Sequence, residues 1–245
     1  MARPGALSGP PPAGQPPRGT VILLHGLNRT QLSMAPLAWR LRRAGCRTAN
    51  WYYPSRRRRI AEHADWLLAR LRREHAGDEG PFHFVGHSLG GIVTRAALQR
   101  CAPDELPRTR LGRLVMLGPP NHGSELAHQL CGTLAGRLVY GEHCFRELAQ
   151  RELMEALGVP PLPCGVIAGA RGDGRGWNPA LPGDDDGVVT LEGTHCPGEA
   201  DHLVLRAVHT VLPWKREVAR QVLAFLATGR FATMPADAAP HASQP

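Results

Sequence analysis

The chain lacks several features that would place it in other classes of protein. No run of apolar residues approaches the roughly 20 that a membrane-spanning helix requires. Residues 1–19 are rich in proline, glycine and alanine. They contain no apolar segment of the kind found in secretory signals, so we expect a disordered lead-in. The tail, residues 231–245, has the same character, and together these absences favour a cytoplasmic location.

The chain also lacks the residue spacings that are typical of metal sites. The six cysteines (46, 101, 131, 144, 164 and 196) are scattered, without a Cys-x-x-Cys pair or zinc-finger spacing to histidines. In a reducing cytoplasm they are expected to be free and mostly buried thiols. Three consecutive aspartates at 184–186 are too few to indicate a calcium site. We therefore expect no metal and no cofactor.

Lysine is almost absent, since Lys215 is the only one, and arginine carries nearly all of the net charge of +8. The densest run is Arg56–Arg59, which is expected to open a helix that continues to residue 73. No recognition motif or aromatic stacking platform accompanies the charge, so nucleic-acid binding is not expected. The positive surface favours transient contact with anionic membranes. Nothing in the sequence indicates an obligate protein partner.

What the chain does contain is a regular alternation of strand-length apolar runs and segments of helical periodicity. This pattern predicts one α/β domain over residues 20–230, with a mostly parallel, doubly wound sheet flanked by helices. The expected strands cover residues 20–24, 47–53, 82–85, 114–117, 165–169 and 203–208, and the main helices cover 34–44, 60–73, 90–98 and 217–225.

The most informative segment is GHSLG at residues 86–90, between an expected strand and an expected helix. A sharp turn there forces unusual backbone angles on Ser88, and Gly86 and Gly90 let the strand and helix pass without a clash. The hydroxyl of Ser88 then projects at the positive end of the helix. A lone G-x-S-x-G string is a weak signal, but its position between a strand and a helix makes it strong.

Four further segments extend this pattern along the chain. They are HGL at 25–27, GPPNHGS at 118–124, DGVV at 186–189 and HTVLP at 209–213. Together with the serine turn they resemble the motifs of the α/β-hydrolase superfamily, in its bacterial lipase/esterase branch. The resemblance covers about residues 20 to 230. It implies the α/β-hydrolase fold and a serine hydrolase activity.

A serine nucleophile requires a base, and the base requires a carboxylate that orients it. The resemblance implies the order serine, acid, histidine along the chain, which Ser88, Asp186 and His209 obey. Asp186 precedes glycine and two valines, and His209 follows the last expected strand. The alternatives that stay open are Asp184 and Asp185 for the acid, and His195 and His202 for the base.

The resemblance also implies an oxyanion hole made by the backbone N–H groups of Leu27 and Leu89. Asn121 and His122 border the expected cleft and are candidates for the substrate pocket, although a purely structural loop role for His122 remains an alternative. His25 is expected to brace its own loop. The side chain of His87 should point away from that of Ser88 and support the turn from beneath.

Residues 124–163 are the natural place for a small helical lid or cap. Four leucines recur there at every fourth position and predict one apolar helix stripe. The stripe fits a helix over an acyl pocket as well as a helix packed against the sheet. The four leucines are Leu126, Leu130, Leu134 and Leu138.

These observations predict a serine ester hydrolase of the lipase/carboxylesterase type, which cleaves small-molecule or lipid esters through an acyl-enzyme on Ser88. An acyltransferase uses the same three residues but must exclude water and seat an acceptor. A catalytically silent binding protein on the same scaffold is the third class, and the complete residue set argues against it. Acyl-chain length and headgroup depend on pocket shape, which the sequence does not determine.

Overall fold

The computed structural model describes residues 16–74, 80–102 and 110–234. At its centre lies a six-stranded sheet in the order β2-β1-β3-β4-β5-β6, with every neighbouring pair parallel, so the expected parallel α/β architecture is confirmed. Nearly all of the two expected disordered ends, residues 1–15 and 235–245, lies outside the described residues. The strands are β1 (Thr20–Leu24), β2 (Arg47–Trp51), β3 (Phe82–His87), β4 (Leu111–Leu117), β5 (Cys164–Ala170) and β6 (Asp201–Arg206).

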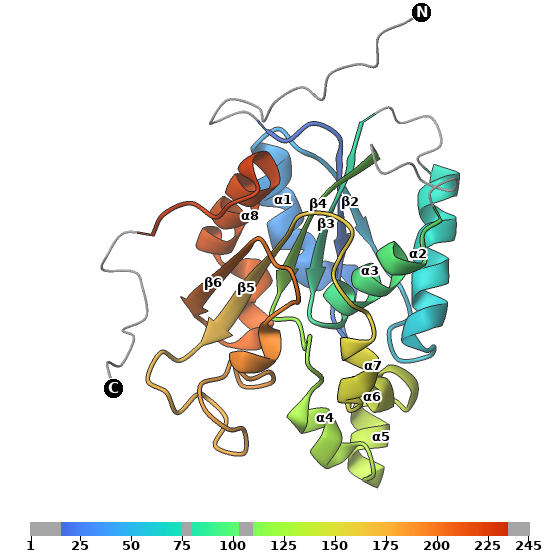
Figure 1. Cartoon of the computed structure of the whole chain (residues 1–245), viewed down its shortest axis with the longest axis vertical. Coiled ribbons are helices and arrows are strands. Elements are labelled where there is room, and N and C mark those ends of the chain that lie inside the picture. Colours follow the sequence, from blue (N-terminus) through green and yellow to red (C-terminus); the bar gives the residue numbers. More distant parts are fainter. Residues whose placement is uncertain (1–15, 75–79, 103–109, 235–245) are drawn as a thin grey trace, which may run out of the picture.

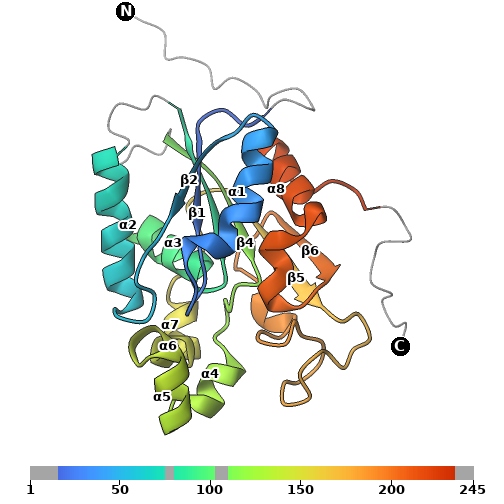
Figure 2. The same cartoon turned by 180° about the vertical axis from the view of Figure 1, so that it is seen from behind.

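Helices cover both faces of this sheet. α1 and α8 lie on one face, while α2 and α3 lie on the other (Figures 1 and 2). Short helices α4 to α7 gather beyond the carboxyl ends of the strands (Figure 1). The helices are α1 (Ala35–Arg43), α2 (Ile60–Glu74), α3 (Leu89–Arg100), α4 (Glu125–Leu130), α5 (Leu134–Tyr140), α6 (His143–Leu148), α7 (Arg151–Glu155) and α8 (Arg216–Thr228).

The core consists of two layers because the sheet separates two sets of side chains. In β1, Ile22 and Leu24 pack in the cluster that includes α2 and α3, whereas Val21 and Leu23 pack in the cluster that includes α1 and α8. All five residues of β1 are buried. A strand covered on both faces is apolar at every position, which explains its unbroken hydrophobic run.

Several element boundaries differ from those expected, among them those of α2, β2 and β6. Helix α2 begins at Ile60, so Arg56–Arg59 form a turn before the helix rather than its first residues. Strand β2 ends at Trp51, and beyond it the Tyr53 N–H donates to a histidine ring nitrogen across the loop. Strand β6 runs from Asp201 to Arg206, because its parallel pairing with β5 covers those residues.

The structure bears on two expectations drawn from composition, one about the cysteines and one about membrane-spanning helices. All six cysteines are free, and Cys46, Cys144, Cys164 and Cys196 are buried. Burial raises the pKa of Cys46 to about 11, so its reactive thiolate is scarce at neutral pH. Among the described residues, no helix combines the length and the apolar character needed to cross a bilayer.

The four leucines expected to form one stripe do not share a helix. α4 ends at Leu130, and Thr133 caps the separate helix α5 by accepting a hydrogen bond from the Gly136 N–H. Leu134 and Leu138 are 73% and 68% exposed. The expectation of a single apolar helix over 126–138 is therefore wrong, because a local cap interrupts the helical spacing.

Two buried histidines predict how stability depends on pH. Burial is the main cause that lowers the pKa of His63 and of His83 to about 4, from the usual 6.5. As the pH falls below about 6.5, the unfolded chain binds protons at these sites before the folded chain does. We therefore expect the free energy of unfolding, measured by urea denaturation, to fall between about pH 6.5 and about pH 4.

A variant assigns part of this effect to one residue. The ring of His63 packs edge-on against Tyr53, at a centroid distance of 4.8 Å, so His63→Phe preserves an aromatic contact without a titrating group. This variant should lose less stability between neutral and acidic pH than the wild type. The exposed His143→Phe is the matched control. An unchanged pH dependence in His63→Phe would contradict the assignment.

Candidate active site

The turn between β3 and α3 places Ser88 at its apex. The backbone angles of Ser88 are φ 53° and ψ −122°, in a region that residues with a side chain rarely occupy. Its N–H donates to the carbonyl of Leu117 on β4 at 2.8 Å, which ties the turn to the neighbouring strand. The sheet therefore holds Ser88 in a strained conformation that presents its side chain beyond the strand ends.

Gly86 and Gly90 are required by close backbone contacts, as the sequence predicted. A Cβ atom on Gly86 would lie 2.4 Å from the backbone nitrogen of Gly91 on α3. A Cβ atom on Gly90 would lie 2.4 Å from the carbonyl oxygen of Leu24 on β1. Any side chain at either position would push the helix away from the sheet and displace the serine.

Asp186 and His209 meet at the carboxyl edge of the sheet. The Nδ1–H of His209 donates to Asp186 Oδ2 at 2.6 Å, and both side chains are almost fully buried. Asp186 Oδ1 accepts the N–H groups of Val188 and Val189, at 3.0 and 2.8 Å. These bonds fix the carboxylate, and a neutral His209 ring that donates from Nδ1 has Nε2 as its acceptor nitrogen.

The other two aspartates of the triplet hold the loop rather than the histidine. Asp184 accepts the N–H groups of Arg171 and Gly172, each at 2.8 Å. Asp185 is fully buried and accepts N–H groups from residues 177, 178 and 187. All three carboxylates thus have separate partners, and Asp186 is the one that contacts His209.

Ser88 and His209 line the same cavity. Within the described part of the chain no hydrogen bond joins the Ser88 hydroxyl to the histidine ring. In proteins without bound substrate such catalytic contacts are often long and tighten only in the complex. The geometry therefore supplies a fixed acid–histidine pair and a serine facing one shared space.

Two further histidines support this arrangement. His87 Nε2 donates to the backbone carbonyl of His209 at 3.0 Å, and burial lowers the pKa of His87 well below its usual value. His87 therefore stays neutral and positions the backbone of its partner. The carbonyl of His25 accepts the Tyr53 hydroxyl at 2.7 Å, which braces the loop after β1.

The cavity has a volume of about 320 Å³ and mostly apolar walls. Helices α4, α5 and α6 supply one side of it, while the loops after β1 and β5 supply the other. The sequence did not predict most of these wall residues. They come from separate short helices, so their positions depend on how the helices pack and follow no regular spacing. The apolar residues in the lining are Leu27, Pro120, Leu126, Val139, Tyr140, Phe145, Leu148, Val188 and Val189.

Leu27 and Leu89, whose backbone N–H groups are the candidates for an oxyanion hole, are close to Ser88 in the chain or in the loop after β1. Leu89 is the first residue of α3, where N–H groups have no partner inside the helix. Leu27 follows Gly26, whose Cβ position would be 3.1 Å from Ser88 Cβ. In the described ranges neither N–H donates to another group of the chain, so both are free to bind an anion.

Asn121 and His122 occupy structural positions outside the cavity wall. Asn121 Oδ1 accepts from the buried Arg95 at 2.7 Å, and Asn121 Nδ2 donates to the Thr194 carbonyl at 2.8 Å. His122 lies 3.7 Å from Glu155. Neither residue lines the cavity that holds Ser88. Their nearness in sequence to Pro120 and Ser124, which do line it, made them candidates.

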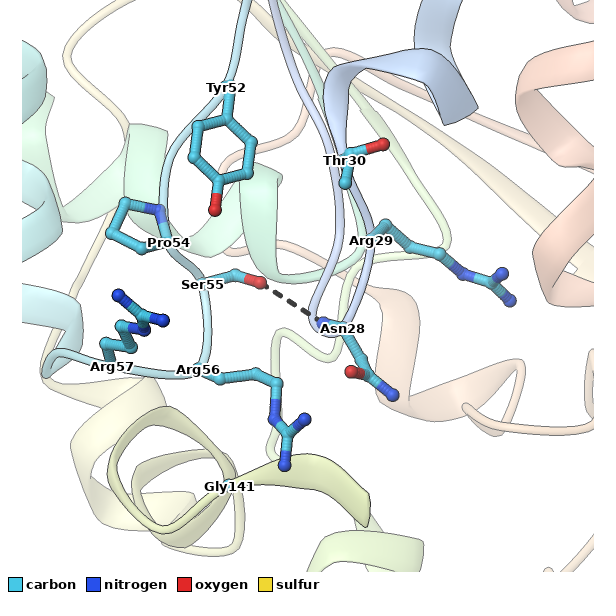
Figure 3. A pocket seen from close by; sticks show the side chains of 9 residues that line it. All are labelled: Asn28, Arg29, Thr30, Tyr52, Pro54, Ser55, Arg56, Arg57 and Gly141. Atoms are coloured by element: carbon cyan, nitrogen blue, oxygen red, sulfur yellow. Dashed lines mark hydrogen bonds between the residues drawn. The ribbon is translucent and has the colours of Figure 1, made fainter. Parts of the chain in front are cut away.

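A second hollow shares part of its lining with this cavity, and Figure 3 shows the residues that line it. Asn28 and Arg29 line both spaces. Arg56 and Arg57, from the turn before α2, line the second hollow only. The sequence had assigned these arginines to a helix face.

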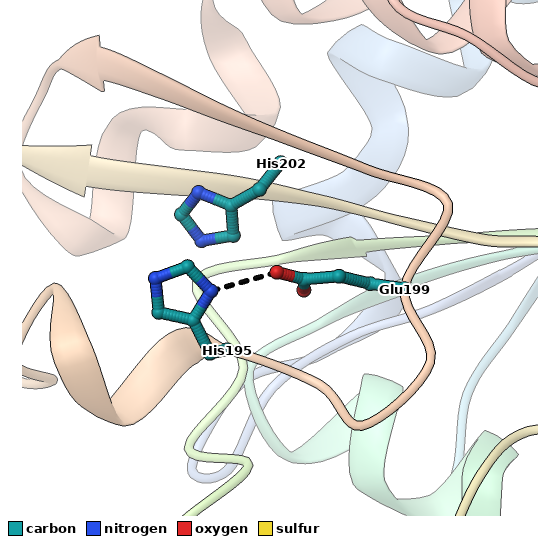
Figure 4. A group of neighbouring side chains, drawn as sticks. All are labelled: His195, Glu199 and His202. Atoms are coloured by element: carbon teal, nitrogen blue, oxygen red, sulfur yellow. Dashed lines mark hydrogen bonds and ion pairs between the residues drawn. The ribbon is translucent and has the colours of Figure 1, made fainter.

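His195, Glu199 and His202 form a cluster of possible metal ligands, with ligand atoms within 4.8 Å of one another (Figure 4). His195 Nδ1 donates to Glu199 Oε1 at 2.7 Å. The two imidazole rings are stacked, with centroids 4.1 Å apart and planes inclined by 21°. A ring nitrogen binds a metal in the plane of its ring, so two nearly parallel stacked rings cannot both bind one ion. We therefore do not interpret the cluster as a metal site. Neither histidine lines the Ser88 cavity.

The parallel sheet, the strained serine between β3 and α3, and the acid–histidine pair at the strand ends define a class. The chain is an α/β-hydrolase. A family profile described as palmitoyl protein thioesterase matches residues 20–157, more than half of the 245 residues. The chain belongs to this family.

Solved structures show the same fold. The lipase BlEst2 of Bacillus licheniformis in its mature form has a TM-score of 0.66 and 21% identity, over 90% of this chain and 94% of that one. The metagenomic carboxyl esterase MGS0156 has a TM-score of 0.65 and 20% identity, over 94% of this chain and 75% of that one. At such identities the likeness concerns the fold alone.

The propeptide form of BlEst2 gives a TM-score of 0.68 at 22% identity, over 97% of this chain. This chain spans about half of that longer form, 54% of its length. A comparison with curated protein sequences found no match.

Proposed function

We propose that this protein is a serine hydrolase that cleaves carboxylic esters through an acyl-enzyme on Ser88. The observation that carries the proposal is the 2.6 Å bond between His209 Nδ1 and Asp186 Oδ2, at the wall of an apolar cavity that also contains Ser88. A buried carboxylate that holds a histidine beside a strained serine is what nucleophilic catalysis requires.

In the first step, His209 Nε2 takes the hydroxyl proton of Ser88 as the serine oxygen attacks the ester carbonyl. The N–H groups of Leu27 and Leu89 donate to the oxygen that becomes negative. His209 then gives its proton to the departing alcohol, and the C–O bond to the leaving group breaks. Asp186 stays ionised and stabilises the charged imidazole.

In the second step, water replaces the alcohol. His209 removes a proton from the water, which attacks the acyl carbonyl, and Ser88 leaves with that proton. The acyl chain lies against the apolar side chains of α4 to α6, among them Leu126, Phe145 and Leu148. The short helices over 124–163 thus act as the cap of the acyl site. The chemistry needs no cofactor.

We expect p-nitrophenyl esters of medium acyl chains to turn over repeatedly in buffer without an added acceptor. Water reaches the acyl-enzyme of a hydrolase, so p-nitrophenolate should accumulate far beyond one equivalent of enzyme. The measurement is absorbance over time at known enzyme concentration. A single burst that resumes only when an alcohol or thiol is supplied would assign the protein as an acyltransferase instead. Folded protein with neither burst nor turnover would assign a silent scaffold.

Thioester hydrolysis is a second candidate, and the name of the matching family, palmitoyl protein thioesterase, favours it. The same three residues attack either carbonyl, but a thiolate leaves without needing a proton from His209. The two activities can be distinguished by comparing an oxoester and a thioester that carry the same acyl chain. A much higher kcat/KM for the thioester would name it as the preferred substrate.

A further inference from the structure

The hollow beside the Ser88 cavity is built from three segments that are distant in the sequence. Residues 28–30 follow β1, residues 52–57 connect β2 to α2, and Gly141 ends α5. Its volume is about 460 Å³. Figure 3 shows Ser55 bonded to Asn28 and Arg56 directed toward Gly141, while the side chain of Arg29 points away from residues 52–57.

Defined contacts hold these segments together. Ser55 Oγ accepts the Asn28 N–H at 3.1 Å, and Arg56 Nη2 donates to the Leu138 carbonyl at 2.5 Å. Gly141 has φ of 82°, and its Cβ position would be 3.0 Å from the Arg56 carbonyl oxygen. The end of α5 therefore lies close against the turn that carries the arginines, and it orients Arg56.

The charge of the hollow is of one sign. Arg29, Arg56 and Arg57 line it, and no aspartate or glutamate does. In the part of the chain that the structure describes, none of these three guanidinium groups forms an ion pair with a carboxylate. Three positive charges that share a hollow without a counter-charge attract an anion.

The donors favour phosphate among the anions. A guanidinium group matches two phosphate oxygens with two parallel N–H donors. The hydroxyl groups of Tyr52 and Thr30 and the amide of Asn28 add neutral donors around the same hollow. A dianionic phosphate has enough acceptor sites for several of these groups at once, whereas a carboxylate has only two oxygens.

The hollow and the reaction site share the segment that carries Asn28 and Arg29. Arg29 is close enough to His87 for its charge to contribute to the lowered pKa of that residue. A molecule with its acyl chain in the apolar cavity and its carbonyl at Ser88 can therefore extend its leaving group past this segment into the arginine hollow.

We propose that the hollow binds a phosphate group carried by the leaving group of the substrate, so that this hydrolase prefers acyl esters of phosphate-bearing alcohols or thiols. The inference rests on the proposed function and names the substrate class of the same site. The phosphate belongs to the substrate molecule itself. Attraction of the arginines to an anionic membrane surface is the competing explanation, and the test separates the two.

The experiment compares monodecanoylglycerol with its phosphate monoester, which differ only in the phosphate. We expect wild-type kcat/KM to be at least about tenfold higher for the phosphate ester, a preference of about 1.4 kcal/mol. In the double variant Arg56→Gln/Arg57→Gln the ratio of the two kcat/KM values should fall to about one. Arg58→Gln/Arg59→Gln removes the same charge from the same arginine run outside the hollow, and it should keep the ratio.

Arg57→Gln alone controls for indirect effects through α5. In the described ranges its guanidinium makes no hydrogen bond to the protein, so its loss leaves the Arg56 contact with Leu138 intact. We expect this single variant to lower the ratio as well. An unchanged ratio in Arg57→Gln would overturn the part of the proposal that places the phosphate against Arg57.

Other outcomes are equally decisive. A ratio near one in active wild-type enzyme would overturn the phosphate site while leaving ester hydrolysis intact. Equal losses in both double variants, or a preference seen only on vesicles of anionic phospholipid, would assign the arginines to surface attraction. If the protein hydrolysed no ester, the proposed function would fail. Calorimetric binding of glycerol phosphate, absent in Arg56→Gln/Arg57→Gln, would still decide whether the hollow binds phosphate.

Discussion

Ser88→Ala is expected to abolish covalent labelling by a fluorophosphonate and to lower kcat/KM on an activated ester by at least about 10³-fold. The variant removes the oxygen that is proposed to form the acyl bond, while the N–H groups of Leu27 and Leu89 remain. Alanine keeps the Cβ atom of serine at φ 53°, so the turn bears the same backbone strain. The measurements are gel fluorescence after labelling and initial rates on p-nitrophenyl esters.

Ser124→Ala is the matched control, because Ser124 is the other serine that lines the same cavity. It caps α4 by accepting the Ala127 N–H, so its loss should lower stability by about 1 kcal/mol without preventing labelling. Labelling that persists in folded Ser88→Ala and disappears in Ser124→Ala would transfer the nucleophile role to Ser124.

The second prediction with a large effect tests which aspartate is the acid and which histidine is the base. We expect His209→Ala to reduce kcat about as much as Ser88→Ala, and Asp186→Asn to reduce it by about 10²- to 10⁴-fold. The amide of asparagine donates where Asp186 Oδ2 accepted, so it would favour the wrong histidine tautomer. Asp185→Asn should instead lower the free energy of unfolding by about 1–3 kcal/mol, since its carboxylate holds three backbone N–H groups.

Kinetics and urea denaturation of each variant provide the measurement. His195→Ala and His202→Ala are the controls for the base, because both residues lie outside the cavity wall. They should retain most of the activity. A larger loss of kcat in Asp185→Asn than in Asp186→Asn, or an active His209→Ala enzyme, would reassign these roles.

The turn at Ser88 could be predicted because its signature lies within the five consecutive residues 86–90. Gly86 is required by the backbone of Gly91 within the same strand–turn–helix unit, and Gly90 is required by the carbonyl of Leu24 on the adjacent strand β1. That one aspartate of the 184–186 triplet meets His209 could also be predicted. Both follow neighbouring parallel strands, whose carboxyl ends meet at one edge of the sheet.

Two expectations, the leucine stripe over 126–138 and the place of Asn121 in the pocket, do not agree with the structure. A regular leucine spacing over 126–138 predicts one helix, but the Thr133 cap starts a new one and leaves Leu134 and Leu138 exposed. Asn121 stands beside a cavity-lining proline in the sequence, yet its amide joins Arg95 to the Thr194 carbonyl. The Thr133 cap is a local feature that the leucine spacing concealed, whereas the partners of Asn121 include Thr194, which lies far along the chain.

The sequence by itself determined the α/β class, the strands and the residues that meet at the strand ends, because short-range sterics and hydrophobic periodicity specify these features. Only the tertiary structure decided which aspartate contacts His209, since backbone N–H groups elsewhere in the loop hold Asp184 and Asp185. It also decided the cavity walls and the arginine hollow. Parallel pairing of β1 with β2 brings the residues after each strand together, so that the Asn28 N–H donates to Ser55 Oγ, a contact between residues that the sequence alone does not connect.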